Sequence, residues 1–348
     1  MAEKKILGEL ELNRIYQRDC IEGMRMIPDG TVDLIIADPP YNIGKDKWDK
    51  WRTIDDYIEW MGKVIAQFQR VLKPNGSIYI FHNDMPQIAR LMEWIRNNSS
   101  IKFKQLIVWN KKFPGASNEG FLQGFNEVEG LRNYQKMAEY CLFYTFQDET
   151  GLTAVKLDVN NFSTLRAYFR DFQHALGMTK KAIIDAVGQR ADHCFRWSSS
   201  QWDMPTPETY DALLALPRNA TFIPREYESL REEYESLREE YESLRYTFNN
   251  QKTHHSVWNY EIAPKQGHMT PKPVELIKTI LRHSSNENDV VLVPFCGSGS
   301  ECVAATKLGR NFVSFELESK YVEIANIRLE SVLAEMETEA SDEQTIPQ

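Results

Sequence analysis

Short apolar runs alternate with amphipathic stretches over the first 146 residues of the chain and again after residue 255. The β-branched apolar run at 32–38 predicts a strand buried on both faces, which carries no polar alternation. Residues 54–72 have apolar side chains at helical spacing, and the Lys-Pro-Asn-Gly sequence at 73–76 is predicted to end that helix. Further strands are expected at 77–81, 103–109, 138–146, 290–295 and 311–316, and further helices at 85–95, 270–281, 300–308 and 321–335.

Strands that alternate with helices indicate an α/β domain with a parallel, doubly wound sheet. The alternation stops near residue 150, gives way to several short helices over 162–216, and resumes near 255. We therefore expect one domain in two halves, 1–150 and 255–335, separated by an inserted helical region at 151–254. The acidic tail at 336–348 is expected to be disordered.

Composition narrows the class of protein. The 348 residues are 42% hydrophobic and 26% charged, which is ordinary for a soluble globular chain. No apolar run approaches the roughly 20 residues of a membrane helix, and the N-terminal MAEKKILGEL lacks the apolar region of a signal peptide. The five cysteines are scattered and form no CxxC pair, so we expect reduced thiols and no metal site.

The net charge of −9 is unusual for a protein that binds nucleic acid, but it is unevenly distributed. The segment from 330 to the C-terminus holds six acids and no base, and 225–245 holds eight Glu and four Arg. Without these segments, with net charges of −6 and −4, the remainder has a charge of about +1. Basic faces are therefore compatible with the composition.

The sequence Asp38-Pro39-Pro40-Tyr41 ends the strand predicted at 32–38 and is the first candidate for chemistry. An exocyclic amine of a nucleic-acid base is a poor nucleophile, because its lone pair is delocalised into the ring. Asp38 and the carbonyl of Pro39 can accept its two N–H groups and draw that lone pair back onto nitrogen. Tyr41 offers a ring face to an extruded base. A plain strand-ending turn is the simpler alternative, because Asp and Pro are common turn residues.

A glycine-rich turn, Phe295-Cys296-Gly297-Ser298-Gly299, lies between a predicted strand and a predicted helix. Glycines at such a place let the backbone approach a ligand closely at a helix N-terminus. Glu316 ends the next strand, where an acid can hold ribose hydroxyls. A structural turn is the alternative, and the absence of a following Gly-Lys-Ser/Thr argues against a phosphate loop.

These motifs and their surroundings resemble the β class of DNA amino-methyltransferases, in which the catalytic block precedes the cofactor block. The resemblance covers 12–146 and 255–330, and its most specific stretches are RDCIEGMRMIPDGTVDLIIADPPYNIG, HMTPKPVELIKTIL and VVLVPFCGSGSECVAATKLGRNFVSFE. It implies a seven-stranded, mostly parallel Rossmann-like sheet with permuted motif order. It also implies S-adenosylmethionine as the cofactor, double-stranded DNA as the partner and the cytoplasm of a bacterium or phage-infected host as the location.

The resemblance assigns roles to individual residues. Asp38 to Tyr41 become the catalytic residues, and Lys272 is a cation that suits the methionine carboxylate. Glu316 is expected at the ribose and Asp19 near the adenine ring of the cofactor. The cofactor-binding set implied by the resemblance is Asp19, Thr270, Lys272, Pro273, Phe295, Cys296, Gly297, Ser298, Gly299 and Glu316.

Two departures from the family pattern leave alternatives open. Val293 stands where the family has an aspartate that helps position the methionine moiety, and Ser314 stands where it has a glycine. The first departure motivates a rival reading, a DNA-binding regulator with an impaired cofactor site. An aspartate-first tetrad favours N6 of adenine, with N4 of cytosine as the alternative. RNA or protein-amide methylation is disfavoured by the insertion, and a C5-cytosine enzyme by the lack of Pro-Cys.

The insertion is the expected target-recognition region. Residues 176–216 resemble a helix-turn-helix, with a first helix at 180–187, a turn at Gly188 and a recognition helix at 190–197. An ordinary small helical bundle is the alternative. The candidate DNA contacts are Lys111, Lys112, Lys180, Lys181, Arg190, His193 and Arg196, with Arg166 and Arg170 as further phosphate contacts.

The repeat YESLREE-YESLREE-YESLR at 227–245 places tyrosine and leucine at two heptad positions of a helix predicted over 225–246. Arg231 and Glu235 can pair at i,i+4. The repeat is interpreted as an antiparallel arm or a homodimer contact, or equally as a solvated spacer. Trp48 and Trp51 are interpreted as a lid over the flipped base or as packing residues.

Overall fold

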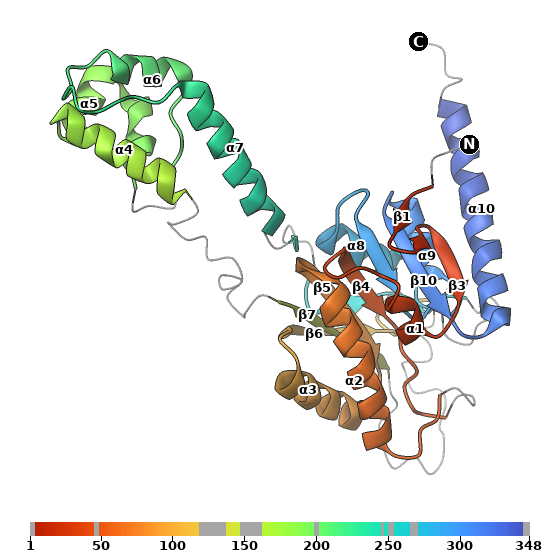
Figure 1. Cartoon of the computed structure of the whole chain (residues 1–348). Coiled ribbons are helices and arrows are strands. Elements are labelled where there is room, and N and C mark those ends of the chain that lie inside the picture. The colour runs from red at the N-terminus through yellow and green to blue at the C-terminus, as the bar shows by residue number, and fades with distance from the viewer. Residues whose placement is uncertain are drawn as a thin grey trace. The chain divides into compact units, whose positions relative to one another are not determined.

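The structure is a computed structural model that describes residues 4–44, 49–117, 137–146, 162–197, 202–244, 247–249, 254–264 and 271–343 (Figure 1). The chain divides into two compact units. The first combines Met1–Gly151 with Tyr246–Gln348, and the second is Leu152–Arg245. The predicted insertion, 151–254, extends further toward the C-terminus than the second unit does.

The first unit is built on a mixed sheet. Its strands are β3 (Arg14–Gln17), β4 (Val32–Ala37), β5 (Leu72–His82), β6 (Lys102–Asn110), β7 (Ala138–Thr145), β8 (Val257–Asn259), β9 (Val290–Val293) and β10 (Asn311–Glu316), while β1 (Ile6–Leu7) and β2 (Leu10–Glu11) form a separate pair. The order is β3-β10-β9-β4-β5-β7-β6-β8. Every neighbouring pair is parallel except the two that include β7. The predicted α/β fold with a mostly parallel sheet is confirmed.

Helices cover both faces of this sheet (Figure 1). One face packs against α1 (Cys20–Met24), α2 (Ile54–Val71) and α3 (Met85–Asn98), and the other against α8 (Val274–Ser284), α9 (Ser300–Lys307) and α10 (Ser319–Glu343). Side chains of a strand alternate between faces. In β4, Ile35 therefore joins the first core and Leu34 the second, and both are fully buried. Burial on two faces explains the continuous apolar run.

Helix α2 illustrates how local sequence sets the fold. A capping box at its start pairs Thr53 with Asp56, which satisfies backbone N–H groups that the helix leaves free. Its apolar stripe, which includes Met61, Ile65 and Phe68, is fully buried against the sheet. The helix ends at Val71 as predicted from the Lys-Pro-Asn-Gly sequence. That sequence is part of β5, where the pairing with β4 shifts register.

Two expectations about the first unit need correction. The main sheet has eight strands among the described residues rather than seven, because β8 pairs with β6 at the edge. The acidic C-terminal segment is not disordered from 336, since α10 continues to Glu343; residues 344–348 lie outside the described part.

The described part of the second unit is helical. It contains α4 (Ser163–Leu176), α5 (Lys180–Val187), the 3₁₀ helix η2 (Gln189–Phe195), α6 (Pro207–Leu214) and α7 (Tyr227–Leu244). Phe169, Phe172 and Tyr210 form the centre of its core. Leu230 of the first heptad is fully buried there, with Tyr234 and Leu237 packed against the same core. The repeat is therefore partly a core element of this unit.

The predicted recognition helix at 190–197 is not an α-helix. Its residues form η2, in which backbone bonds span three residues, as from Arg196 N–H to the carbonyl of His193. The buried carboxylate of Asp192 pairs with both Lys180 and Arg196. These ion pairs tie η2 to α5 and lower the pKa of Asp192 to about 2.

Candidate active site

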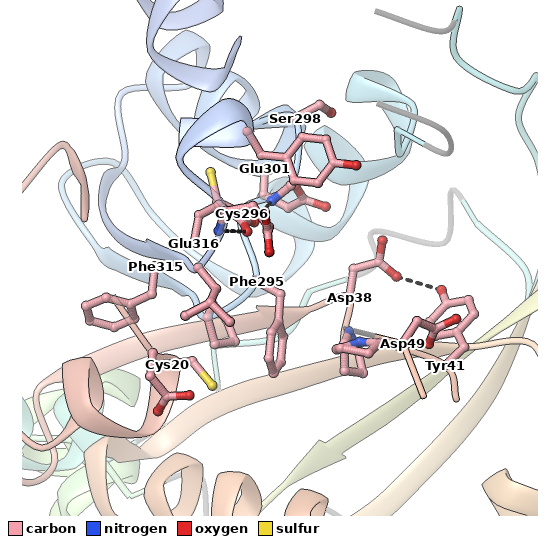
Figure 2. A pocket seen from close by; sticks show the side chains of 18 of the residues that line it. Cys20, Asp38, Tyr41, Asp49, Phe295, Cys296, Ser298, Glu301, Phe315 and Glu316 are labelled. Atoms are coloured by element: carbon pink, nitrogen blue, oxygen red, sulfur yellow. Dashed lines mark hydrogen bonds between the residues drawn. The ribbon is translucent and has the colours of Figure 1, made fainter. Parts of the chain in front are cut away.

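A cavity of about 270 Å³ opens at the carboxyl ends of β4, β9 and β10 (Figure 2). Open α/β sheets bind ligands at this edge. Both predicted motifs line it, although they are far apart in the sequence. Their lining residues are Asp38, Pro39, Pro40, Tyr41, Phe295, Cys296, Gly297, Ser298 and Glu316.

Two donors hold the carboxylate of Asp38, which follows directly after β4. The Tyr41 hydroxyl donates to Oδ1 over 2.6 Å, and the Lys272 ammonium donates to Oδ2 over 2.5 Å. The Asp38 side chain is still 20% exposed. Because each carboxylate oxygen has two lone pairs, Asp38 can also accept a hydrogen bond from a ligand in the cavity.

Asp38 belongs to a buried network of four charges. Lys272, 4% exposed, also lies 3.4 Å from the carboxylate of Glu139 on β7, which is 2% exposed. Lys111 forms an ion pair with the other oxygen of Glu139. The two ammonium groups thus balance the two carboxylates. Burial opposes the charge on Lys272, but Asp38 and Glu139 outweigh it and raise the pKa of Lys272 above its ordinary value.

Tyr41 is packed inside the protein, contrary to the expectation that it presents a face to a base. Its side chain is 5% exposed, and its ring stacks on His82 with 4.8 Å between centroids. Its hydroxyl bonds Asp38 and lies 3.3 Å from Glu139. Burial, followed by the charges of Asp38 and Glu139, raises the pKa of the Tyr41 hydroxyl. In this conformation Tyr41 orients Asp38.

The glycine turn connects β9 to α9 through left-handed backbone conformations. Gly297 has φ of 51° and Gly299 has φ of 79°, values that favour glycine. A Cβ on Gly299 would come within 2.8 Å of Cβ of Ala325, so helix α10 also excludes a side chain there. The Glu316 carboxylate accepts the N–H groups of Gly297 and Glu318. Strand β10 and the turn thus hold one carboxylate at the cavity wall.

The remaining predicted cofactor residues differ in where they lie. Asp19 lines the cavity and caps α1 by accepting the N–H groups of Ile21 and Glu22. Gly299 and Pro273 do not line the cavity, since they occupy the N-terminal ends of α9 and α8. Thr270 lies outside the described residues. The ammonium group of Lys272 forms ion pairs with Asp38 and Glu139. Its predicted role, binding of the methionine carboxylate, therefore stays a prediction.

Aromatic side chains form one side of the cavity. Trp51, Trp60 and Phe295 all line it, and Trp51 lies 4.8 Å from Trp60 between ring centroids. Trp60 in turn lies 5.9 Å from the ring of Phe295. Trp51 therefore packs against other aromatic rings and also borders the cavity, so its position is compatible with either predicted role, a lid over the flipped base or a packing residue. Trp48 lies outside the described residues.

Sequence reasoning missed three buried acids, one of which is Asp49, a fully buried residue that lines the cavity. Glu139 and Glu301 are each at least 96% buried. A charge inside the apolar strand sequence AEYCLFYTF could have indicated Glu139. An acid directly after the glycine turn could have indicated Glu301, which lines the cavity.

The predicted DNA contacts have different environments. Lys111 is part of the buried network, and Lys180 and Arg196 pair with Asp192, so internal acids already use these three cations. Arg166 is buried and donates to the carbonyl of Trp197, which contradicts a phosphate contact. The predicted contacts on the surface of the second unit are Lys181, Arg190 and His193, together with Arg170, while Lys112 of the first unit is half-buried.

Two classes of feature are not found within the described ranges. No group of three His, Cys, Asp or Glu side chains there is arranged to hold a metal ion. No helix there combines the length and the apolar surface needed to cross a membrane.

Comparison with known proteins places the chain in a family. The profile of the N6_N4_Mtase family, described as DNA methylase, matches residues 32–327. The chain is 25% identical over 325 residues to the Type II methyltransferase M1.MboII of Moraxella bovis, covering 92% of this chain and 97% of that protein. It is 27% identical over 337 residues to the DNA adenine methyltransferase YhdJ of Escherichia coli K12, covering 92% and 83%.

A solved structure shares the fold. The PvuII DNA methyltransferase, described as cytosine-N4-specific, aligns with a TM-score of 0.50 at 12% identity and covers 92% of this chain and 89% of its own. The family match spans the catalytic motif, the glycine turn and Glu316. This chain therefore belongs to the N6_N4_Mtase family of DNA methylases.

Proposed function

We propose that the chain transfers the methyl group of S-adenosylmethionine to N6 of an adenine flipped out of double-stranded DNA. The observation that carries this proposal is that Asp38, the glycine turn at Gly297 and the carboxylate of Glu316 line one and the same cavity. The similarity to YhdJ, a DNA adenine methyltransferase, and the aspartate-first tetrad support adenine.

The residues present fit the cofactor. The glycine turn leaves backbone exposed at the cavity, and Glu316 is held there with its carboxylate able to accept ribose hydroxyls. Phe295, Trp51 and Trp60 supply apolar surface for the adenosyl group. When bound, S-adenosylmethionine supplies an electrophilic methyl group on a sulfonium.

Asp38 prepares the nucleophile. Its carboxylate accepts an N–H of the target amine, which returns electron density to the nitrogen that attacks the methyl group. Hydrogen bonds from Lys272 and Tyr41 hold that carboxylate in a fixed orientation before the base arrives. Preformed donors and acceptors of this kind need no reorganisation during the reaction.

The second unit is the proposed target-recognition region. Exposed Lys181, Arg190 and His193 lie on or beside η2 and α5 and form a candidate DNA-contacting surface. In a helix-turn-helix-like reading, η2 takes the place of the recognition helix. Arg190→Ala and Lys181→Ala should weaken DNA binding and reduce its salt dependence, without changing affinity for the cofactor.

The decisive experiment uses the variant Asp38→Asn. It keeps the shape of the side chain but removes the charge, so turnover should fall by about 100-fold or more while S-adenosylmethionine affinity changes little. Methyl transfer is measured on DNA, and digestion to nucleosides with mass spectrometry identifies the modified base. If the digest contained N4-methylcytosine, the target base would be cytosine and not adenine. Calorimetry that detects no S-adenosylmethionine binding to the unmodified chain would instead favour the DNA-binding regulator.

A further inference from the structure

Glu301 is a buried carboxylate that the proposed chemistry leaves without a role. It is the second residue of α9, directly after the glycine turn, and it is 4% exposed. It lines the same cavity as Asp38, Lys272 and Ser298. Figure 2 shows Glu301 beside Cys296 and Ser298, at the part of the pocket formed by the turn.

No cation of the described part of the chain is bound to this carboxylate. Within the described ranges, Glu301 forms no hydrogen bond or ion pair from its carboxylate to another residue. Two cations are near enough to act on it, but Lys272 is bonded to Asp38 and Arg328 donates to Ser298. An uncompensated buried carboxylate is costly, so its presence in a cavity points to a cationic ligand.

The surroundings of Glu301 oppose the ionised form of its carboxylate. Burial, and then repulsion from Asp38, raises the pKa of Glu301 to about 7. A hydrogen bond from the backbone N–H of Glu301 itself, followed by the charges of Lys272 and Arg328, acts in the opposite direction and only partly offsets this rise. A cation that enters the cavity would restore the ionised form.

We propose that Glu301 binds the α-ammonium group of the methionyl part of S-adenosylmethionine. The proposal rests on the proposed function. An ammonium offers three N–H donors, whereas a sulfonium offers none. Val293, which ends β9 and stands where the family resemblance implies an aspartate, is fully buried and apolar. We infer that the acid absent from the end of β9 is supplied from the first turn of α9.

The test compares three ligands with the full chain and its Glu301→Gln variant. S-adenosylmethionine and S-adenosylhomocysteine carry the ammonium group, and 5′-methylthioadenosine lacks the amino-acid part. In calorimetry at pH 8, the variant should bind the first two about 10- to 100-fold more weakly and the third with an affinity unchanged within about twofold. Glu323→Gln, a matched change on the exposed side of α10, should bind all three ligands as the unmodified chain does.

A second measurement detects the proton that the Glu301 carboxyl group releases when the ligand binds. With Asp38, Lys272 and Arg328 facing it, Glu301 holds a proton in part of the free protein near pH 6.5 and should lose it when an ammonium binds. Titrations in two buffers with different ionisation enthalpies should therefore detect proton release on binding S-adenosylhomocysteine. Glu301→Gln should abolish that component, and Glu301→Asp should retain part of it together with more affinity than Glu301→Gln.

Each contrary outcome has a distinct meaning. An unmodified chain that binds neither S-adenosylmethionine nor S-adenosylhomocysteine would reject the proposed function itself. Normal binding that Glu301→Gln does not change would reject only the role of Glu301. A loss confined to S-adenosylmethionine would assign the carboxylate to the sulfonium, and an equal loss for 5′-methylthioadenosine would reduce Glu301 to a structural residue. Either result overturns the proposal.

Discussion

Lys272→Met tests whether one buried ammonium holds the carboxylate of Asp38 and the sheet together. The ammonium lies 2.5 Å from Asp38 and 3.4 Å from Glu139. With an effective dielectric constant of about 20, these distances correspond to gross attractions of ~7 and ~5 kcal/mol. Desolvation of the buried ions offsets several kcal/mol of this sum, and removal of one partner from such a network costs about 3–5 kcal/mol. We expect a loss of about 3 kcal/mol in the free energy of unfolding of the first unit.

The pH of the measurement follows from the sign of the pKa shift. The pKa of Lys272 is raised in the folded protein, so its stabilisation is complete below the unfolded value of about 10.4 and is lost only at higher pH. Native-state hydrogen exchange of amides in β4 and β5 at pH 7.5 therefore reports the full effect. These strands belong to the first unit, so unfolding of the second unit does not contribute.

Two variants control for the effect of the substitution itself. Lys278→Met removes a lysine whose partner, Glu275, is mostly exposed, and should cost less than about 1 kcal/mol. Lys272→Met combined with Glu139→Gln removes one charge of each sign, so it should recover at least half of the lost stability. A cost below about 1 kcal/mol for Lys272→Met, or no recovery in the double variant, would refute the balanced network.

The remaining predictions concern Glu301 and the heptad helix. The folded-state pKa of Glu301 is about 7 instead of 4.5, so between these pH values the folded chain binds more protons than the unfolded chain does. The free energy of unfolding should therefore fall as pH rises from about 5 to 7. Thermal unfolding across this range should show no such fall in Glu301→Gln; a parallel fall in both proteins would contradict the assignment. Deleting residues 234–240 regenerates the same heptad sequence, so the second unit should keep its stability within about 0.5 kcal/mol by hydrogen exchange. Leu230→Ala should instead cost about 3 kcal/mol there, because the side chain is fully buried; equal effects of the two changes would show that the helix does not pack as described.

Features carried by contiguous residues could be predicted from the sequence. The apolar run of β4 predicted a strand covered on both faces, and the motif beginning at Asp38 follows that strand directly. The turn around Gly297 was recognised because left-handed backbone conformations demand glycine. Parallel strands align their carboxyl ends, so placing both motifs at strand ends was enough to predict one shared cavity.

The mistaken elements depend on contacts that local patterns do not encode. Residues 190–197 have the length of a recognition helix, but Asp192 binds cations on both sides of it and the segment forms a 3₁₀ helix. Strand β8 was missed because three residues carry too little periodicity, and its pairing with β6 defines it.

The sequence by itself determined the fold class, the family and the two strand-end motifs, because each follows from the identity and spacing of neighbouring residues. Only the tertiary structure decided the charge environment of the site. Antiparallel β7 lies between β5 and β6, and this order brings Glu139 to Lys111 and Lys272. Burial largely removes these three residues, and Glu301 at the cavity, from water. Their charges therefore interact more strongly with neighbouring groups than exposed charges do, and these interactions affect stability and binding. Coulomb energy depends on distance and dielectric environment, and both are properties of the folded chain.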